Sequence, residues 1–151
     1  MSALAQAVGR WCQREYVRAR FVAGKAVDWR VFLSRGTLEM IEAAEACGWW
    51  ACVPINPVAL RFATPGTLSR VAPWVGPADP APPSAPLVAA IGEFCRLQLA
   101  YAEVMRAAGF VSLRCDGAPW RGHVDAVALA VMDAAAAGGL WRAEAPGEAV
   151  P

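Results

Sequence analysis

The sequence has few of the residues that form metal and cofactor sites. Its 151 residues include one histidine, His123, and no Cys-x-x-Cys pair, whereas a structural zinc site needs clustered cysteine and histidine ligands. No glycine-rich phosphate loop or paired-carboxylate motif is present either. We therefore expect neither a metal nor a cofactor. The cysteines are interpreted as reduced packing residues: Cys12, Cys47, Cys52, Cys95 and Cys115.

A long uninterrupted hydrophobic run is also missing. The most apolar stretch, residues 124–140, is broken by Asp125 and Asp133 and is rich in small side chains, so it does not predict a membrane-spanning helix. The first residues lack the basic start and apolar run that are typical of a secretory signal. We expect a cytoplasmic protein with no membrane span.

Charged side chains are scarce as well. Only 18% of the residues are charged, 57% are hydrophobic, and the net charge is +1. Few charges are left to cover the surface, and a chain this apolar often buries part of its exterior against a partner. The composition favours a homo-oligomer or a complex with another protein.

Proline, by contrast, recurs at a regular spacing in the middle of the chain. Four prolines lie three residues apart, which is one turn of a polyproline II helix: Pro77, Pro80, Pro83 and Pro86. Nine steps of about 3.1 Å would reach roughly 28 Å, close to the width of a small domain. The alternative interpretation is a docking motif for an aromatic-lined groove.

We expect one domain over residues 1–151. The parts on either side of the prolines are each short for an independent core, so residues 73–86 are predicted to form a polyproline II strap that joins two halves of a shared core. Residues 142–151 are rich in Gly, Ala, Glu and Pro and are predicted to form a frayed tail.

Hydrophobic periodicity predicts about four helices. Apolar residues recur at helical spacing over residues 3–22, from Thr37 to the cap glycine Gly48, over residues 87–108, and from Pro119 onward. The helix over 87–108 is apolar around more than half of its circumference, because two residues widen a face that is already apolar: Leu97 and Val104.

Two segments have the pattern of strands. Residues 49–64 alternate and then turn at Asn56-Pro57, which predicts a hairpin, and residues 110–115 predict a short strand that joins it. Together with the helices, this predicts an α+β fold that is mainly α, with about four helices packed against a small antiparallel sheet.

Basic residues gather near the N-terminus. Arg10, Arg14 and Arg18, here called the arginine ridge, follow one flank of the first helix at i, i+4 and i+8. The ridge is a candidate for nucleic-acid binding, and the order of elements up to residue 64 also fits a winged-helix regulator. The near-neutral charge instead favours a solvated flank that pairs with the acidic helix of residues 37–47.

A nucleophile and a base could be supplied by Cys115 and His123. A cysteine beside a histidine is the minimum for thiol catalysis, but a buried cysteine and a histidine at a helix start explain the same residues. A Cys/His enzyme therefore stands as a second alternative.

The helix ends EAAEACGWWACV and EVMRAAGFVSLRC share a glutamate, a cap glycine and a following aromatic residue. An internal duplication would produce this similarity, as would the common way in which α/β chains leave a helix. Both interpretations are open at this point.

Exposed apolar residues suggest contact surfaces. Leu129 and Met132 make the last helix apolar on two sides, as expected for a subunit contact, and Trp49 and Trp50 lie on the predicted hairpin. The sequence is best interpreted as that of a non-catalytic interaction or assembly subunit with these four residues as its contacts.

Overall fold

The computed structural model describes residues 2–24, 27–64, 67, 74, 76–77, 79–112 and 117–143, with the side chain of Pro57 excepted. Over these residues the chain forms five α-helices and two 3₁₀ helices (η) and contains no strand. In chain order they are α1 (Ala3–Ala23), η1 (Trp29–Phe32), α2 (Arg35–Ala46), α3 (Pro57–Arg61), α5 (Ala85–Ala107), η2 (Pro119–His123) and α6 (Ala126–Ala137).

The predicted sheet is wrong, because the described chain is all-helical. Residues 49–56 are coil, and the chain then enters α3 rather than a second strand. The Asn56 side chain accepts a hydrogen bond from the Val58 amide (2.9 Å), and Pro57 occupies the first helical turn, so this pair starts a helix instead of turning a hairpin. Residues 110–112 are coil, and the rest of the predicted strand 110–115 lies outside the described residues.

The larger helices begin at polar side chains that satisfy a free amide group. Ser2, Ser34, Ser84 and Asp125 each accept a hydrogen bond from the amide three residues further on. Such a cap stabilises a helix by about 1 kcal/mol.

No described helix is both long enough and apolar enough to cross a membrane.

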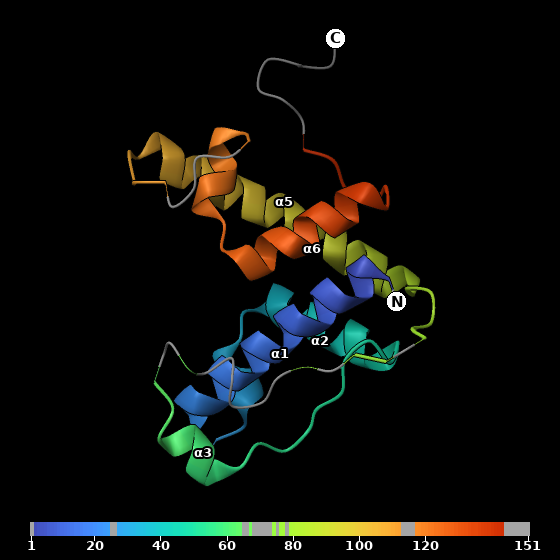
Figure 1. Cartoon of the computed structure of the whole chain (residues 1–151), viewed down its shortest axis with the longest axis vertical. Coiled ribbons are helices and arrows are strands. Elements are labelled where there is room, and N and C mark those ends of the chain that lie inside the picture. Colours follow the sequence, from blue (N-terminus) through green and yellow to red (C-terminus); the bar gives the residue numbers. More distant parts are fainter. Residues whose placement is uncertain are drawn as a thin grey trace.

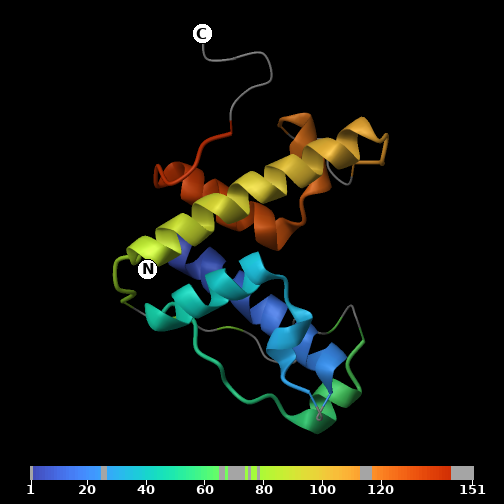
Figure 2. The ribbon, with the colours of Figure 1, turned by 180° about the vertical axis from the view of Figure 1, so that it is seen from behind.

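The four larger helices pack crosswise. α1 lies mainly against α6, and α5 lies mainly against α2, so each helix has its chief partner in the other half of the chain. Figure 1 shows α1 and α6 on the near side, and Figure 2 shows α5 and α2 from behind. Where the halves meet, the rings of Trp11 and Phe94 pack edge to face at 4.9 Å. One hydrophobic core therefore draws on both halves.

The two halves repeat one structural unit. Each unit has a helix of more than twenty residues, a 3₁₀ helix, a polar N-cap, a 12-residue helix and a glycine of positive φ. In the first unit, the tryptophan of the 3₁₀ helix, Trp29, meets Trp50 edge to face at 6.3 Å. In the second unit, Trp120 meets Trp141 in the same way at 6.2 Å.

The sequences of the two units follow the same correspondence. Residues 29–51 align without a gap with residues 120–142 and share these pairs: Trp29/Trp120, Arg30/Arg121, Leu38/Leu129, Ala43/Ala134, Ala44/Ala135, Ala46/Ala137, Gly48/Gly139 and Trp50/Trp141. The long helices also align without a gap and share Leu4/Leu87, Ala7/Ala90, Gly9/Gly92, Cys12/Cys95 and Ala19/Ala102.

The chain is therefore an internal duplication of a helix, 3₁₀ helix, helix unit. The helix ends compared in the sequence belong to α2 and α5, which are not the equivalent pair: α2 corresponds to α6, and α1 corresponds to α5. The crosswise packing is the arrangement that a two-fold axis between the units would generate.

The residues directly before α5 contact the first unit. The Trp49 indole Nε1 donates a hydrogen bond to the Ala81 carbonyl oxygen (2.7 Å), and the Ser84 amide donates to the Cys47 Sγ (3.3 Å). Pro77, Pro80 and Pro83 are in coil, whereas Pro86 lies in the first turn of α5.

Candidate functional site

A groove runs between α2 and α5. At one end it opens into a cavity of ≈ 580 Å³. The N-cap Ser34 and the α2 residues Thr37 and Glu39 line one side of it, and α5 contributes Phe94, Leu97 and Tyr101. A second hollow of ≈ 650 Å³ continues it toward the beginning of α5 and shares three residues with the first: Glu39, Ala90 and Glu93. We call the two hollows together the α2–α5 groove.

Two of the three glutamates that line the groove are paired with arginines on their own helices, and the third, Glu42, is exposed. Arg35 Nε lies 3.2 Å from Glu39 Oε1 on α2, and Arg96 Nη2 lies 2.9 Å from Glu93 Oε2 on α5. All four side chains are more than half exposed, so each pair contributes at most about 1 kcal/mol to stability. The groove therefore has an apolar floor and a rim of exposed ion pairs.

Apolar side chains extend from the groove along the outer side of α5. Leu97, Tyr101 and Val104 are 54%, 63% and 64% exposed, and their spacing of i, i+4 and i+7 puts them on one face of the helix. We call these three residues the outer strip. Just beyond the helix, Phe110 and Val111 are also exposed, so the apolar surface continues past the end of α5.

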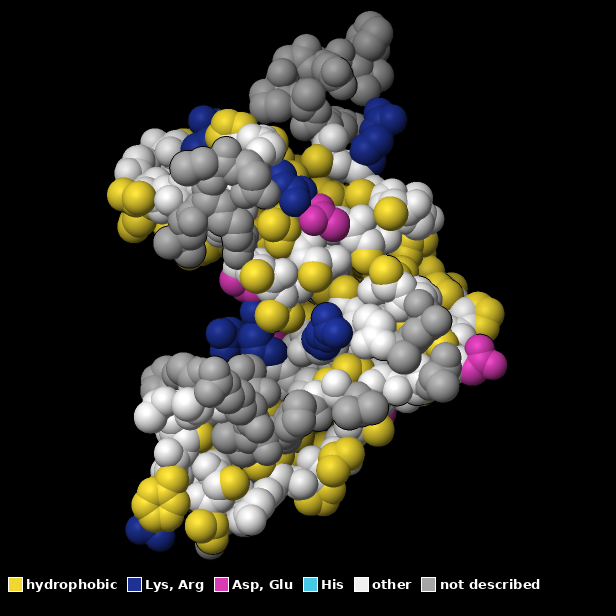
Figure 3. Space-filling view, viewed as in Figure 1, with side chains coloured by type: hydrophobic (Ala, Val, Ile, Leu, Met, Phe, Trp, Pro, Cys, Tyr) yellow, Lys and Arg dark blue, Asp and Glu magenta, His cyan; other side chains and the backbone are white. Residues whose placement is uncertain are grey.

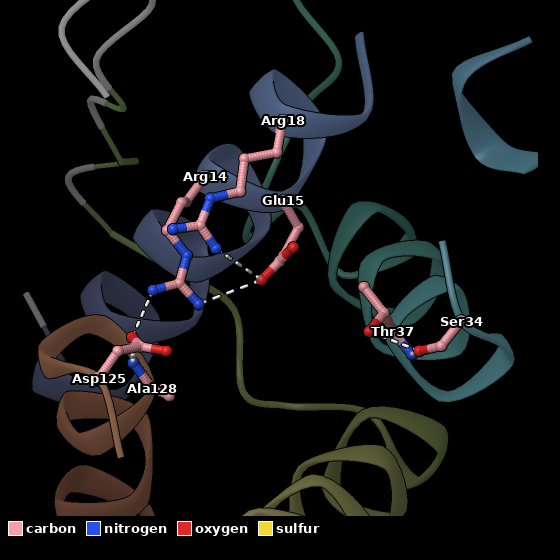
Figure 4. Close-up of polar contacts among 7 residues, drawn as sticks. All are labelled: Arg14, Glu15, Arg18, Ser34, Thr37, Asp125 and Ala128. Atoms are coloured by element: carbon pink, nitrogen blue, oxygen red, sulfur yellow. Dashed lines mark hydrogen bonds and ion pairs between the residues drawn. The ribbon is translucent and has the colours of Figure 1, made fainter. Parts of the chain in front are cut away.

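On the side of the molecule away from the groove, an ion-pair network joins α1 to α6 (Figure 4). The Arg14 guanidinium of α1 contacts the Asp125 carboxylate, the N-cap of α6, and also Glu15 Oε1 at 3.1 Å. Arg18 reaches the same Glu15 oxygen at 4.0 Å. Figure 3 shows arginine side chains in the middle of the face that carries α1 and α6.

The carboxyl group of Asp125 has a lowered pKa. Its partial burial acts to raise the pKa, but the hydrogen bonds from Arg14 and from the Ala128 amide (2.9 Å) outweigh that effect, and the charges of Arg14 and Arg18 add to them. Asp125 therefore joins α1 to α6 as a carboxylate and caps α6 at the same time.

The arginine ridge is only partly available to a ligand. Arg14 is 13% exposed and engaged with two carboxylates, while Arg10 and Arg18 are exposed. The acids that pair with the ridge are Glu15 and Asp125, so the predicted pairing with the glutamates of α2 is wrong.

The predicted contact residues are not on the surface. Trp49, Trp50, Leu129 and Met132 are all buried within the chain, so the expectation that they are exposed is wrong. Leu129 and Met132 are covered because α6 packs against both α1 and α5, which accounts for its two apolar sides. With no hairpin present, both tryptophan rings enter the core, where Trp50 Nε1 donates to Gln13 Oε1 (2.9 Å).

The described residues do not assemble a catalytic or metal centre. His123 ends η2 and is half-buried, whereas Cys115 lies outside the described residues, so the predicted pair is not placed. Burial raises the pKa of Cys95 to about 12 and raises that of Cys12 still more, which leaves both thiols unreactive. No group of three metal-ligating side chains occurs in the part of the chain that is described.

The outer strip was not identified from the sequence, although a signal was present. Residues 87–108 are apolar around more than half of the helix, because Leu97 and Val104 widen a face that is already apolar. A helix that buries one face in the core and is also apolar on the other is a candidate for a second contact.

No protein-family model, curated protein or solved structure matches the chain.

Proposed function

We propose that the protein is a non-catalytic assembly subunit that binds another polypeptide through the outer strip of α5 and the adjoining α2–α5 groove. The observation that carries this proposal is the exposure of Leu97, Tyr101 and Val104 on one face of a 23-residue helix. Contiguous apolar surface of this kind marks interaction sites on folded proteins.

The form of the surface also supports binding of a polypeptide. A groove lined by small residues beside a row of large apolar ones is suited to an amphipathic helix, whose apolar residues recur at the same i, i+4 and i+7 spacing. Apolar contacts dominate the floor, and paired charges lie at the rim, as in protein interfaces with an apolar core and a polar rim.

The arginine ridge gives weaker support for the nucleic-acid alternative. Its central residue, Arg14, is already engaged by Glu15 and Asp125, so binding a phosphate there would require breaking those contacts. Two exposed arginines remain, and each phosphate contact contributes separately to the salt-dependent affinity for nucleic acid.

Site-specific photo-crosslinking in living cells tests the proposal. Benzoylphenylalanine in place of Tyr101 should give discrete protein adducts on irradiation, because the strip is covered by a partner. The matched control puts the same residue in place of Phe62, an aromatic side chain that is 76% exposed on another part of the molecule. No adduct from position 101, or the same adducts from both positions, would contradict the proposal.

A further inference from the structure

The two units carry different residues at equivalent positions of their long helices. In the alignment of α1 with α5, Arg10, Arg14 and Arg18 correspond to Glu93, Leu97 and Tyr101. The arginine ridge therefore overlaps the outer strip at two equivalent positions of the repeated unit, which are basic in the first copy and apolar in the second: Arg14/Leu97 and Arg18/Tyr101.

The helix N-caps beside these surfaces differ in the same way. Asp125 caps α6 and binds Arg14, whereas the equivalent cap of α2 is Ser34, which binds the Thr37 amide and hydroxyl (Figure 4). Leu97, in the place of Arg14, cannot form an ion pair. One seam between the units is thus joined by charge, while the other opens into the α2–α5 groove.

The first copy folds with Arg14 and Arg18 in place of Leu97 and Tyr101, so packing within the chain does not explain that leucine and tyrosine. The third residue of the strip, Val104, corresponds to Phe21, which is itself 41% exposed. An exposed leucine, tyrosine and valine on one face gain free energy only when something covers them.

We propose that a second copy of this chain covers the strip, with the two α5 helices packed against each other about a two-fold axis. The proposal rests on the assembly function above and names its partner. Figure 2 shows that α5 extends well past α2, and the groove is lined by residues of α5 as far as Val104. In a two-fold pair, the projecting half of each α5 lies over the groove of the other copy, and both contacts form at once.

The charge of the surface fits an identical partner. The charged residues of α5 between Leu97 and Ala108 are Glu103 and Arg106, which pair with each other at 2.9 Å, so two strips meet without burying an unpaired ion. Of the three glutamates that line the groove, Glu39 and Glu93 already have arginine partners, and Glu42 is exposed. The net charge of +1 means that two copies hardly repel each other.

The size of the surface is also sufficient. The three residues of the strip together with Phe110 and Val111 present on the order of 500 Å² of apolar area, a large part of the ~800 Å² that each partner contributes to a standard interface. The groove residues from α2 supply further area in the same contact.

Analytical ultracentrifugation of the purified full-length protein over a range of concentrations tests the inference. We expect a monomer–dimer equilibrium, and we expect Val104→Asp to weaken dimerisation about tenfold or more because it places a carboxylate in an apolar contact. The matched control is Val58→Asp, at a valine that is 63% exposed on α3; it should leave the dissociation constant unchanged. Circular dichroism checks that both variants keep their helices.

Two results would overturn the inference: a monomer at every concentration, or equal weakening by both substitutions. Photo-crosslinking of the purified protein from position 101 gives an independent readout, since a second copy must yield adducts of twice the monomer mass. A monomer that forms adducts with a different protein in cells contradicts the second copy and leaves the proposed function intact. No dimer together with no cellular adduct contradicts both.

Discussion

At the scale of single residues, Arg14 and Asp125 show how a charged pair connects distant parts of the chain. They are far apart in sequence, yet the guanidinium and the carboxylate are in contact, and the same carboxylate caps α6. The sequence reveals the arginine row and a plausible cap, but not their pairing, because spacing along one helix carries no information on which other helix crosses it.

The lowered pKa of Asp125 predicts a pH-dependent contribution to stability. The unfolded chain takes up the proton more readily than the folded one, so this contribution is complete above the ordinary aspartate pKa of about 3.9 and is lost as the pH falls through the lower folded value. Asp125→Asn should flatten the dependence of the unfolding free energy on pH below about pH 4.5, and urea unfolding at a series of pH values measures it.

A second substitution separates the two roles of Asp125. Asparagine keeps the N-cap, whereas alanine removes it, so Asp125→Ala should cost about 1 kcal/mol more than Asp125→Asn at neutral pH. Equal stability of the two variants would show that the cap contributes nothing here.

At the scale of elements, hydrophobic periodicity located the long helices, whereas local turn signals gave a wrong prediction of a hairpin. The ranges 3–22 and 87–108 match α1 and α5 within two residues. The predicted hairpin failed because Asn56-Pro57 fits a helix start as well as a turn, and because alternation over a few residues does not show whether any strand lies alongside. The outer strip was not predicted as a contact surface, because periodicity finds apolar faces but not what covers them.

The two tryptophans that follow the 12-residue helices are buried to different extents, so they contribute unequally to stability. Trp50 is fully buried against Tyr16 and Trp29 and hydrogen-bonded to Gln13, whereas Trp141 is half-buried against Trp120. Trp50→Ala should lower the unfolding free energy by about 3–5 kcal/mol. Trp141→Ala should cost less, since its ring leaves a smaller cavity, and chemical denaturation compares the two. A larger loss for Trp141→Ala would contradict this ranking.

At the scale of the whole molecule, the crosswise packing makes each unit depend on the other. α1 has its main contacts with α6, and α2 has its main contacts with α5, so a separated half loses the chief partner of both of its helices. A shared core was predicted from the length of the halves, but the duplication was not found, because the similarity noted in the sequence aligned α2 with α5 rather than with α6.

Separated halves should therefore be unstable alone and recover together. Fragments that end and begin near Gly76 should each show weak, non-cooperative melting by circular dichroism, and an equimolar mixture should regain a cooperative transition. Either fragment melting cooperatively as a monomer would contradict the interdependence of the units.

The duplication also has a consequence for how the surface of this protein can change. If the two units were separate identical chains, every substitution would appear on both sides of the assembly at once, and a face could not become apolar on one side while staying basic on the other. Joining the units in one polypeptide removes that constraint: each mutation now alters one side alone. The contrast between Arg14 and Leu97 is what such freedom produces, a pseudo-symmetric body whose two faces can evolve toward different partners.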